Sequence, residues 1–199
     1  MRRTTPSFLL PGGGRAARLA DWLRAHGEVL RVLGDARGLA EAAPRLFGVI
    51  GPGMRMDAGV LWLIEHRTGA LRSAYVWQGR HGRAPTFDAT VRRASLRSGE
   101  GLAGAAWARM APVWRPARAP EGGRSDLVSD AARTDGLRLG AAFPIRCGGD
   151  FHGVIELAAH KARRDVDDLE IEMQGLGETL GQFLVRQATL QRLGSSERQ

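Results

Sequence analysis

Two pairs of apolar segments, each joined by a short connection, constrain the fold of this chain more than any other feature. The first pair is the nearly unbroken apolar run 59–64 and the alternating run 71–78. The second pair, 141–146 and 151–159, is joined by Gly148-Gly149-Asp150, a sequence typical of a hairpin turn. Strands joined by so short a turn run antiparallel. We therefore expect an antiparallel sheet with 59–64 as a central strand covered on both faces.

Segments with helical spacing of apolar residues lie before, between and after these strands. Apolar residues three and four positions apart indicate the buried face of a helix. The predicted helices are a segment from Arg15 to Leu33, the segment 39–50, a stretch around Phe87, the segment 101–109 and a short helix near 131–139. An antiparallel sheet with helices on its faces belongs to the α+β class.

Alternation along the second predicted strand assigns its side chains to two faces. Successive residues of a strand point to opposite sides of the sheet. We therefore expect one face to carry Leu71, Ser73, Tyr75 and Trp77, and the other to carry Arg72, Ala74, Val76 and Gln78.

The last segment predicts a long helix that begins at Asp165, because aspartate is a good N-cap and more acidic residues follow it. Its apolar residues alternate four- and three-residue steps, which is the heptad spacing of a coiled coil. Glycines at 175, 177 and 181 weaken the helix but permit close packing against a sheet or a partner. We expect a homodimer held through the first and last helices, with the contact residues Leu19, Trp22, Leu23, Leu176, Leu180, Phe183 and Leu190.

The 199 residues divide into one domain with flanking segments. Residues 1–14 contain three consecutive glycines and no periodicity, so we expect them to be disordered. An N-terminal helix at 15–36 precedes the main domain at 37–187, which includes the heptad helix from 165. Residues 188–199 form a C-terminal tail.

Composition narrows the classes of partner. The net charge of +8 raises the possibility of nucleic-acid binding, but Lys161 is the only lysine and the arginines are scattered among acidic residues. We therefore do not favour a nucleic-acid surface.

The single cysteine, Cys147, leaves no internal disulfide and predicts a reducing, cytoplasmic compartment. We expect no membrane association, because no apolar run reaches the roughly 20 residues that cross a bilayer, and the stretch after Arg2-Arg3 is too short for an export signal.

Four short motifs follow one another along the second half of the chain. They are Gly101-Leu102 with Trp107, Pro112-Val113-Trp114, Ala142-Phe143-Pro144-Ile145 and Gly153-Val154-Ile155-Glu156, with Ser129-Asp130 between the second and the third. A glycine–leucine pair that opens a tryptophan-containing helix, a Pro-Val-Trp strand, an aspartate-centred turn and two final strands together resemble the GAF family of sensory domains. The resemblance covers roughly residues 37–187.

The resemblance implies a GAF-like fold and a sensory or regulatory role, in which a small molecule or a signalling-protein partner is bound. It also bears on the ligand. Bilin-binding members use a thiol beside the pocket, whereas Cys147 lies beside a turn, so bilin is not favoured. Members that reduce methionine sulfoxide need several cysteines, and the Asn-Lys-Phe-type element of cyclic-nucleotide-binding members is missing. Haem ligation by a lone histidine, such as His66, His81 or His152, is not favoured either.

Aromatic and polar residues around the predicted Trp107 helix are candidates for a ligand site. Small-molecule pockets combine apolar walls with a few polar groups. The alternative is that the tryptophans only fill the core. The candidate ligand residues are Ser73, Trp77, Phe87, Leu102, Trp107, Trp114, Arg138, Phe143 and Glu156.

Three other groups of residues resemble metal- or phosphate-binding sites but have simpler structural explanations. His152, Glu156 and His160 share one strand face, but residues four apart on a strand are separated by ~13 Å, too far to share one metal ion. The acidic residues of 165–170 are explained by helix capping. The glycines of 99–104 lack the Lys-Ser/Thr of a phosphate-binding loop. We therefore predict no metal site.

These observations predict a cytoplasmic, dimeric sensory module that binds a small molecule or a protein partner and signals through its terminal helices. One alternative is a GAF fold that has lost its ligand and serves as a dimerisation or scaffold module. A small enzyme is a weaker alternative, because no nucleophile, base and orienting group are visible together. We therefore expect the protein not to be an enzyme.

Overall fold

The computed structural model describes residues 15–80, 83–116, 126–161 and 170–196. Among these residues, six strands form one antiparallel sheet with the order β3-β2-β1-β6-β5-β4. The strands are β1 (Ala58–Glu65), β2 (Ala70–Gln78), β3 (Ser95–Leu96), β4 (Val113–Pro116), β5 (Leu139–Cys147) and β6 (Asp150–Ala159). The expectation of an antiparallel sheet with β1 at its centre is confirmed, whereas the short edge strand β3 was not predicted.

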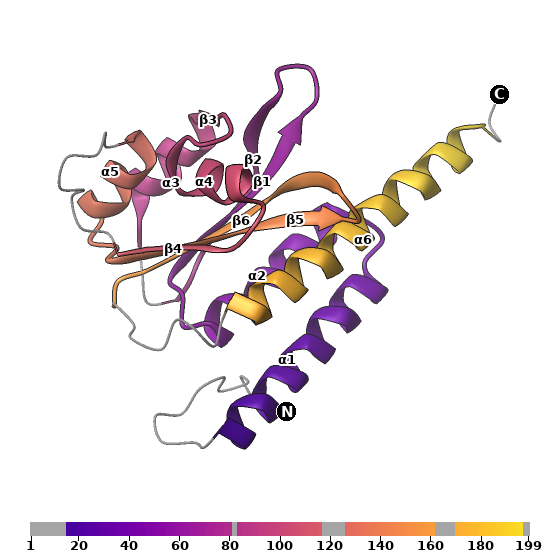
Figure 1. Ribbon diagram of the computed structural model, residues 1–199, viewed down its shortest axis with the longest axis horizontal. Helices are drawn as coiled ribbons and strands as arrows, with labels where there is room; N and C mark the ends of the chain where they lie inside the picture. The colour runs from indigo at the N-terminus through magenta and orange to yellow at the C-terminus, as the bar shows by residue number, and fades with distance from the viewer. Residues whose placement is uncertain (1–14, 81–82, 117–125, 162–169, 197–199) are drawn as a thin grey trace.

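Helices cover both faces of the sheet (Figure 1). On one face lie α2 (Leu39–Gly53) and α6 (Glu170–Ser196), and α1 (Arg15–Asp35) packs over these two helices. On the opposite face lie three short helices, α3 (Pro85–Arg93), α4 (Gly101–Arg109) and α5 (Leu127–Thr134). The α+β class is therefore confirmed. We call these faces the long-helix face and the short-helix face.

Each face of the sheet has its own apolar core, because strand side chains alternate between the two faces. The core of the long-helix face is built around Phe47, Phe143 and Met173, which are fully buried. The core of the short-helix face is built around Trp62 and Phe87, which are also fully buried. The sheet thus separates two cores, and no single interior is shared by all the described helices.

Helix α6 lies directly on β5 because two of its glycines face the strand backbone. A Cβ atom added to Gly177 would lie 2.1 Å from the carbonyl oxygen of Pro144. At Gly181 the same atom would lie 2.0 Å from the carbonyl oxygen of Arg146. Any side chain at these positions would push the helix off the sheet.

The packing of α6 on the sheet shows that part of the predicted dimer contact is wrong. Leu176, Leu180 and Phe183 have exposed fractions of only 2%, 1% and 3%, because they are buried against the sheet of their own chain. The heptad spacing of α6 is therefore satisfied within the molecule. Leu23 and Leu190 are exposed, whereas the side chains of Leu19 and Trp22 lie outside the described residues.

A β-bulge in β2 makes the predicted facing of that strand wrong. Leu61 of β1 pairs with Tyr75, but the next residue, Trp62, pairs with Ser73, so Ala74 is the extra residue. Beyond such a bulge the alternation of side chains is reversed. Leu71 and Ser73 consequently belong to the short-helix face, whereas Tyr75 and Trp77 pack in the core of the long-helix face.

The position of one helix differs from its prediction. Helix α5 spans Leu127–Thr134 instead of lying near 131–139, because Asp126 caps it: the Asp126 carboxylate accepts a hydrogen bond from the Ser129 backbone N–H at 2.9 Å. Helix α6 spans Glu170–Ser196 and includes Leu190, which the heptad spacing places in the predicted helix. The N-cap predicted at Asp165 lies outside the described residues. None of the described helices is apolar over a length that would cross a membrane.

Candidate functional site

Glu156 is the one charged residue that the structure buries among the residues it describes, with an exposed fraction of 4%. It lies at the middle of β6 and pairs across the sheet with Val60 and Ala142, which belong to the short-helix core. The carboxylate therefore faces α4 and α5. Its Oε2 accepts a hydrogen bond from the indole N–H of Trp62 at 2.8 Å.

Burial makes the carboxyl group of Glu156 a weaker acid than an exposed glutamate. Loss of hydration is the main cause and raises its pKa from 4.5 to about 7. The Trp62 hydrogen bond acts in the opposite direction, the charge of Asp126 raises the pKa further, and the charge of Arg115 lowers it. A carboxyl group with a pKa near neutrality can change between hydrogen-bond donor and acceptor with the pH or with a ligand.

The helices above Glu156 are held in place by carboxylates at their ends. Asp126 caps α5 and also lies against the start of α4, since a Cβ atom on Gly101 would be 3.3 Å from its Oδ1. At the other end of α5, the carboxylate of Asp135 accepts a hydrogen bond from the backbone N–H of Phe87 in the first turn of α3, at 2.7 Å. The Asp135 bond links the end of α5 to the first turn of α3, and Asp126 places the start of α5 beside the start of α4.

A stacked aromatic pair lies on the same face, at the far end of α4. The rings of Trp107 and Phe151 have centroids 4.8 Å apart and are tilted by only 2°. Both side chains are half-buried. They offer a flat apolar surface at the edge of the short-helix core, beside the end of β6.

The structure brings together five of the nine predicted ligand residues. Glu156, Trp107, Leu102, Phe87 and Ser73 all belong to the short-helix face, where Ser73 pairs with Trp62 across the sheet.

The other four do not join this group. Trp77, Trp114 and Phe143 pack in the core of the long-helix face, and the side chain of Arg138 is exposed before β5. One pocket containing all nine residues is therefore a wrong prediction. Trp77 fills the core, as its ring lies stacked on Phe47 and occupies the space beside Gly51.

Sequence reasoning missed three residues that surround Glu156, namely Trp62, Arg115 and Asp126. The aspartate-centred turn was assigned to Ser129-Asp130, but Asp126 is the residue that caps α5 and faces Gly101. The available signal was the spacing of Asp126 from Ser129, since an N-cap side chain bonds the N–H three residues later.

Glu156 and His160, which resembled part of a metal site, bond to different partners. Glu156 bonds Trp62, whereas the backbone N–H and ring Nδ1 of His160 lie 2.8 and 3.1 Å from Oδ2 of Asp57. Within the described part of the chain, no three His, Cys, Asp or Glu side chains are close enough to hold one metal ion.

The glycine-rich segment before α4 is explained by packing. The Gly99 N–H donates to the Gly104 carbonyl at 2.7 Å, and a Cβ atom on Gly104 would lie 2.4 Å from the carbonyl oxygen of Arg97. Gly99 and Gly101 both have positive φ angles, which glycine adopts without strain. The glycines therefore shape the entry into α4.

The arrangement of strands and helices identifies the architecture when it is compared with solved structures. A GAF domain from a phosphoenolpyruvate-protein phosphotransferase of Coxiella burnetii matches with a TM-score of 0.69 and 16% identity, covering 86% of this chain and 96% of that chain. The fold is GAF-like. A GAF domain from A. aeolicus matches this GAF-like chain with a TM-score of 0.62 and 17% identity, covering 82% of this chain and 94% of that chain.

The GAF-like fold is shared with an enzyme as well. The free methionine-R-sulfoxide reductase of Neisseria meningitidis, solved in complex with its substrate, matches with a TM-score of 0.68 and 14% identity, covering 92% of this chain and 98% of that chain. No protein-family model and no curated protein matches the sequence. The expected GAF-like fold is thus confirmed by structural likeness at low sequence identity.

Proposed function

We propose that this GAF-like chain is a sensory or regulatory module that binds a small molecule on the short-helix face of its sheet. The observation that carries the proposal is Glu156, a buried carboxyl group at the centre of that face. Burying a charge is costly, so such a group is commonly retained for a function. The apolar residues around it and the Trp107–Phe151 pair supply the apolar walls of a ligand site.

The chemistry of Glu156 restricts the ligand. One carboxyl oxygen is occupied by the Trp62 N–H, which leaves the other oxygen for a polar group of the ligand. In its ionised form Glu156 accepts hydrogen bonds and favours an amine or another cation, and in its protonated form it donates to a carbonyl. We infer a ligand that is mainly apolar and carries one such group.

Arg146 connects α4 on the short-helix face with α6 on the opposite face. Its guanidinium donates a hydrogen bond to the Met110 carbonyl at the end of α4, at 3.3 Å, and another to the Glu178 carboxylate on α6, at 3.0 Å. Arg146 also pairs across the sheet with Phe151, which stacks on Trp107. A ligand that moves α4 would therefore act on α6 through one side chain, which fits a module that signals through its terminal helix.

The coupling through Arg146 is measurable without a ligand. We expect Arg146→Met and Glu178→Gln to show an interaction energy of about 0.5 kcal/mol in a double-mutant cycle by urea unfolding, because the pair is partly exposed. The control pairs Arg146→Met with Glu170→Gln, which removes the same charge from the exposed first turn of α6. Equal interaction energies in the two cycles would exclude a specific Arg146–Glu178 link.

Native mass spectrometry of the freshly purified protein tests ligand binding directly. We expect an additional mass that is lost on denaturation, and a weaker retention of that mass by Glu156→Ala than by Arg138→Ala, whose exposed side chain lies before β5. An unmodified mass, together with no thermal stabilisation by any compound of a metabolite panel, would favour the scaffold module. Turnover of a bound compound would show an enzyme, contrary to our proposal.

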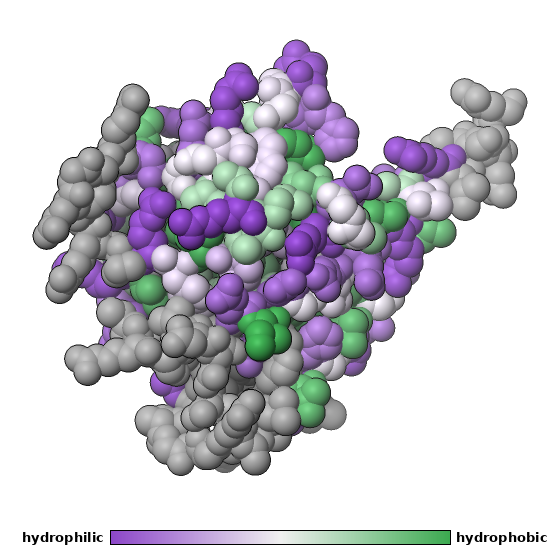
Figure 2. All heavy atoms as spheres, viewed as in Figure 1, coloured by the Kyte–Doolittle hydropathy of each residue, from purple (hydrophilic) through white to green (hydrophobic). Residues whose placement is uncertain are grey.

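We further propose that the module is a homodimer held by α1 and α6. Leu23 and Leu190 have exposed fractions of 62% and 56%, and the end of α6 projects beyond the sheet with hydrophobic and hydrophilic side chains side by side (Figures 1 and 2). A helical end without a partner is marginally stable in water, which favours a second helix beside it.

Light scattering after size-exclusion chromatography tests the dimer. We expect twice the monomer mass for the native chain and the monomer mass for Leu190→Glu. The control is Leu127→Glu on α5, where an 80% exposed leucine lies on the opposite face of the sheet and the same change should leave the dimer intact. A native chain that is monomeric at tens of micromolar would exclude this interface.

A further inference from the structure

Four basic residues lie at one end of the sheet, where β1 and β5 begin and β2 and β6 end. Arg80 comes just after β2, Arg83 just before α3, Arg138 just before β5 and Lys161 just after β6. All four side chains are exposed. The sequence separates these residues by up to 81 positions, but the antiparallel sheet returns all of them to the same end. We call these four residues the basic rim.

Hydrogen bonds join the segments that carry the basic rim. The Asp57 carbonyl accepts the Gly79 N–H after β2 at 2.7 Å, and the Asp57 carboxylate accepts the His160 N–H after β6 at 2.8 Å. The Arg138 N–H donates to the Ala159 carbonyl at 2.7 Å. The side chain of the last residue of β2 also bonds the backbone just before α3. These segments are therefore fixed relative to one another.

Positive charge is in excess at the basic rim. Within the described part of the chain, none of its four side chains is paired with a carboxylate. The carboxylates that join the neighbouring segments, Asp57 and Asp135, instead accept backbone N–H groups of His160 and Phe87. The four cations therefore outnumber the carboxylates beside them and remain open to an outside partner.

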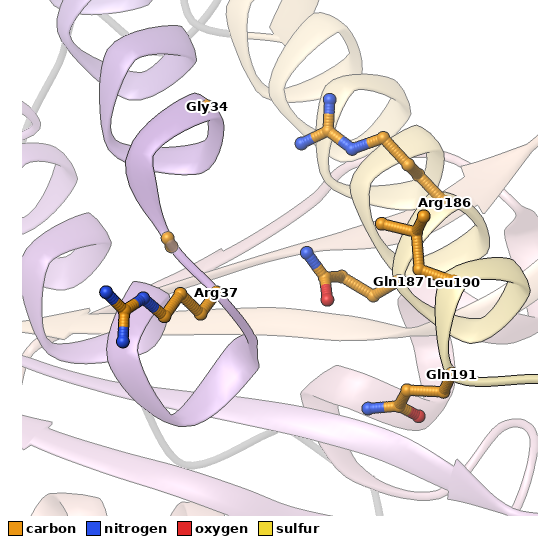
Figure 3. A pocket seen from close by; sticks show the side chains of 7 residues that line it. Gly34, Arg37, Arg186, Gln187, Leu190 and Gln191 are labelled. Carbon is orange, nitrogen blue, oxygen red and sulfur yellow. The ribbon is translucent and has the colours of Figure 1, made fainter. Parts of the chain in front are cut away.

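The two arginines beside the open groove at α6 do not form a second surface of this kind. The Arg37 side chain points away from α6, which carries Arg186 (Figure 3). The guanidinium of Arg186 donates a hydrogen bond to the Leu33 carbonyl at 3.0 Å within its own chain. These two charges are therefore separate, and we assign no binding site to them.

We propose that the basic rim docks an extended acidic segment of a protein partner. Two strands, β1 and β6, lie between β2 and β5, so the rim extends over three strand spacings, about 14 Å. An extended peptide advances about 3.3 Å per residue, so roughly five residues reach across it. Guanidinium groups bind carboxylates in a bidentate manner, which suits glutamate and aspartate side chains along such a peptide.

Two further observations restrict the partner. Among the described residues no Trp, Tyr or Phe side chain is fully exposed, so the basic rim offers no ring on which the bases of a single-stranded nucleic acid would stack. The rim lies on the ends of the strands, whereas Glu156 lies at the middle of β6. Docking at the rim is therefore separate from the ligand site proposed around Glu156, and each can fail without the other.

Fluorescence anisotropy of a labelled octaglutamate peptide, with octaglutamine as the uncharged reference, tests this docking surface. At low salt we expect saturable binding of octaglutamate alone, and weaker binding as the salt concentration rises. The double variant Arg80→Gln with Arg138→Gln should weaken the binding about five- to tenfold, because two ion pairs with the peptide are lost. Both side chains are exposed, so the fold should be kept.

The matched control is Arg93→Gln with Arg97→Gln, which makes the same charge change at two exposed positions, at the opposite end of α3 and just after β3. Native-like affinity in this control, together with the loss in the rim variant, supports the docking surface. Equal weakening in both double variants would show a general effect of net charge and overturn it. The absence of saturable binding up to roughly 1 mM would overturn it too. Tighter binding of a single-stranded oligonucleotide of equal charge, lost in the rim variant, would assign the rim to nucleic acid instead.

Discussion

Gly181→Ala is expected to lower the free energy of unfolding by about 3 kcal/mol or more, at the upper end of what overpacking costs. The added methyl carbon would lie 2.0 Å from the Arg146 carbonyl oxygen and 2.9 Å from the Cys147 backbone nitrogen. These are backbone atoms of β5, which cannot rotate away as a flexible side chain would. The helix must therefore shift off the sheet, and the packing of Leu180 and Phe183 is lost with it.

Gly175→Ala is the matched control on the same helix. A Cβ atom at Gly175 has nothing within 4 Å, so this change is expected to stabilise the chain by up to about 1 kcal/mol through helix propensity. Urea unfolding followed by circular dichroism measures both variants. If Gly181→Ala were as stable as Gly175→Ala, helix α6 would not rest on β5 as described here.

The stability of the native chain is expected to fall as the pH rises from about 4.5 to 7, and Glu156→Gln is expected to remove this dependence. The folded chain raises the pKa of Glu156 from 4.5 to about 7, so the folded state binds the proton more tightly than the unfolded state. The stabilising effect of protonation is fully present below pH 4.5 and is lost as the pH passes 7. The two pKa values correspond to about 3 kcal/mol.

Glu156→Gln keeps a carboxamide oxygen that can accept the Trp62 hydrogen bond, and it carries no charge. We therefore expect the variant to match the native chain near pH 5 and to exceed its unfolding free energy by about 3 kcal/mol near pH 8. Chemical denaturation over this range measures the difference, with Glu170→Gln as the control for an exposed carboxylate. Parallel pH curves for the native chain and Glu156→Gln would show that Glu156 is not the titrating group.

The sheet could be predicted from the sequence because its signals are local. Gly148-Gly149-Asp150 specifies a turn within a few residues, and the unbroken apolar run of β1 requires cover on both faces. The face assignment of β2 failed because the bulge at Ala74 depends on how β1 pairs with it. Nothing within the alternating run itself indicates an extra residue.

The role of α6 could not be predicted from its heptad spacing alone. Leucines at three- and four-residue steps serve equally well against a partner helix or against a sheet. Glycines at 177 and 181 do not decide between the two from sequence, because this spacing also suits a close helix–helix contact. The structure decides, since both positions face backbone carbonyl oxygens of β5. The exposed residues Leu23 and Leu190 remain as the predicted dimer contacts.

The candidate site was found only in part for a similar reason. The motif Gly153-Val154-Ile155-Glu156 drew attention to Glu156, but its partner Trp62 lies 94 residues earlier in the chain. The β1–β6 register brings the two together, and this register is a property of the folded sheet. The tryptophans divide between the two faces for the same reason, with Trp62 and Trp107 on one and Trp77 and Trp114 on the other.

This division of the tryptophans allows the most direct test of the ligand site. Indole N–H resonances in a ¹⁵N–¹H correlation spectrum, assigned by single Trp→Phe changes, can be followed while the compound identified by native mass spectrometry is added. We expect Trp62 and Trp107 to shift while Trp77 and Trp114 stay in place. Shifts confined to Trp77 and Trp114 would place the ligand on the long-helix face and contradict the role assigned to Glu156.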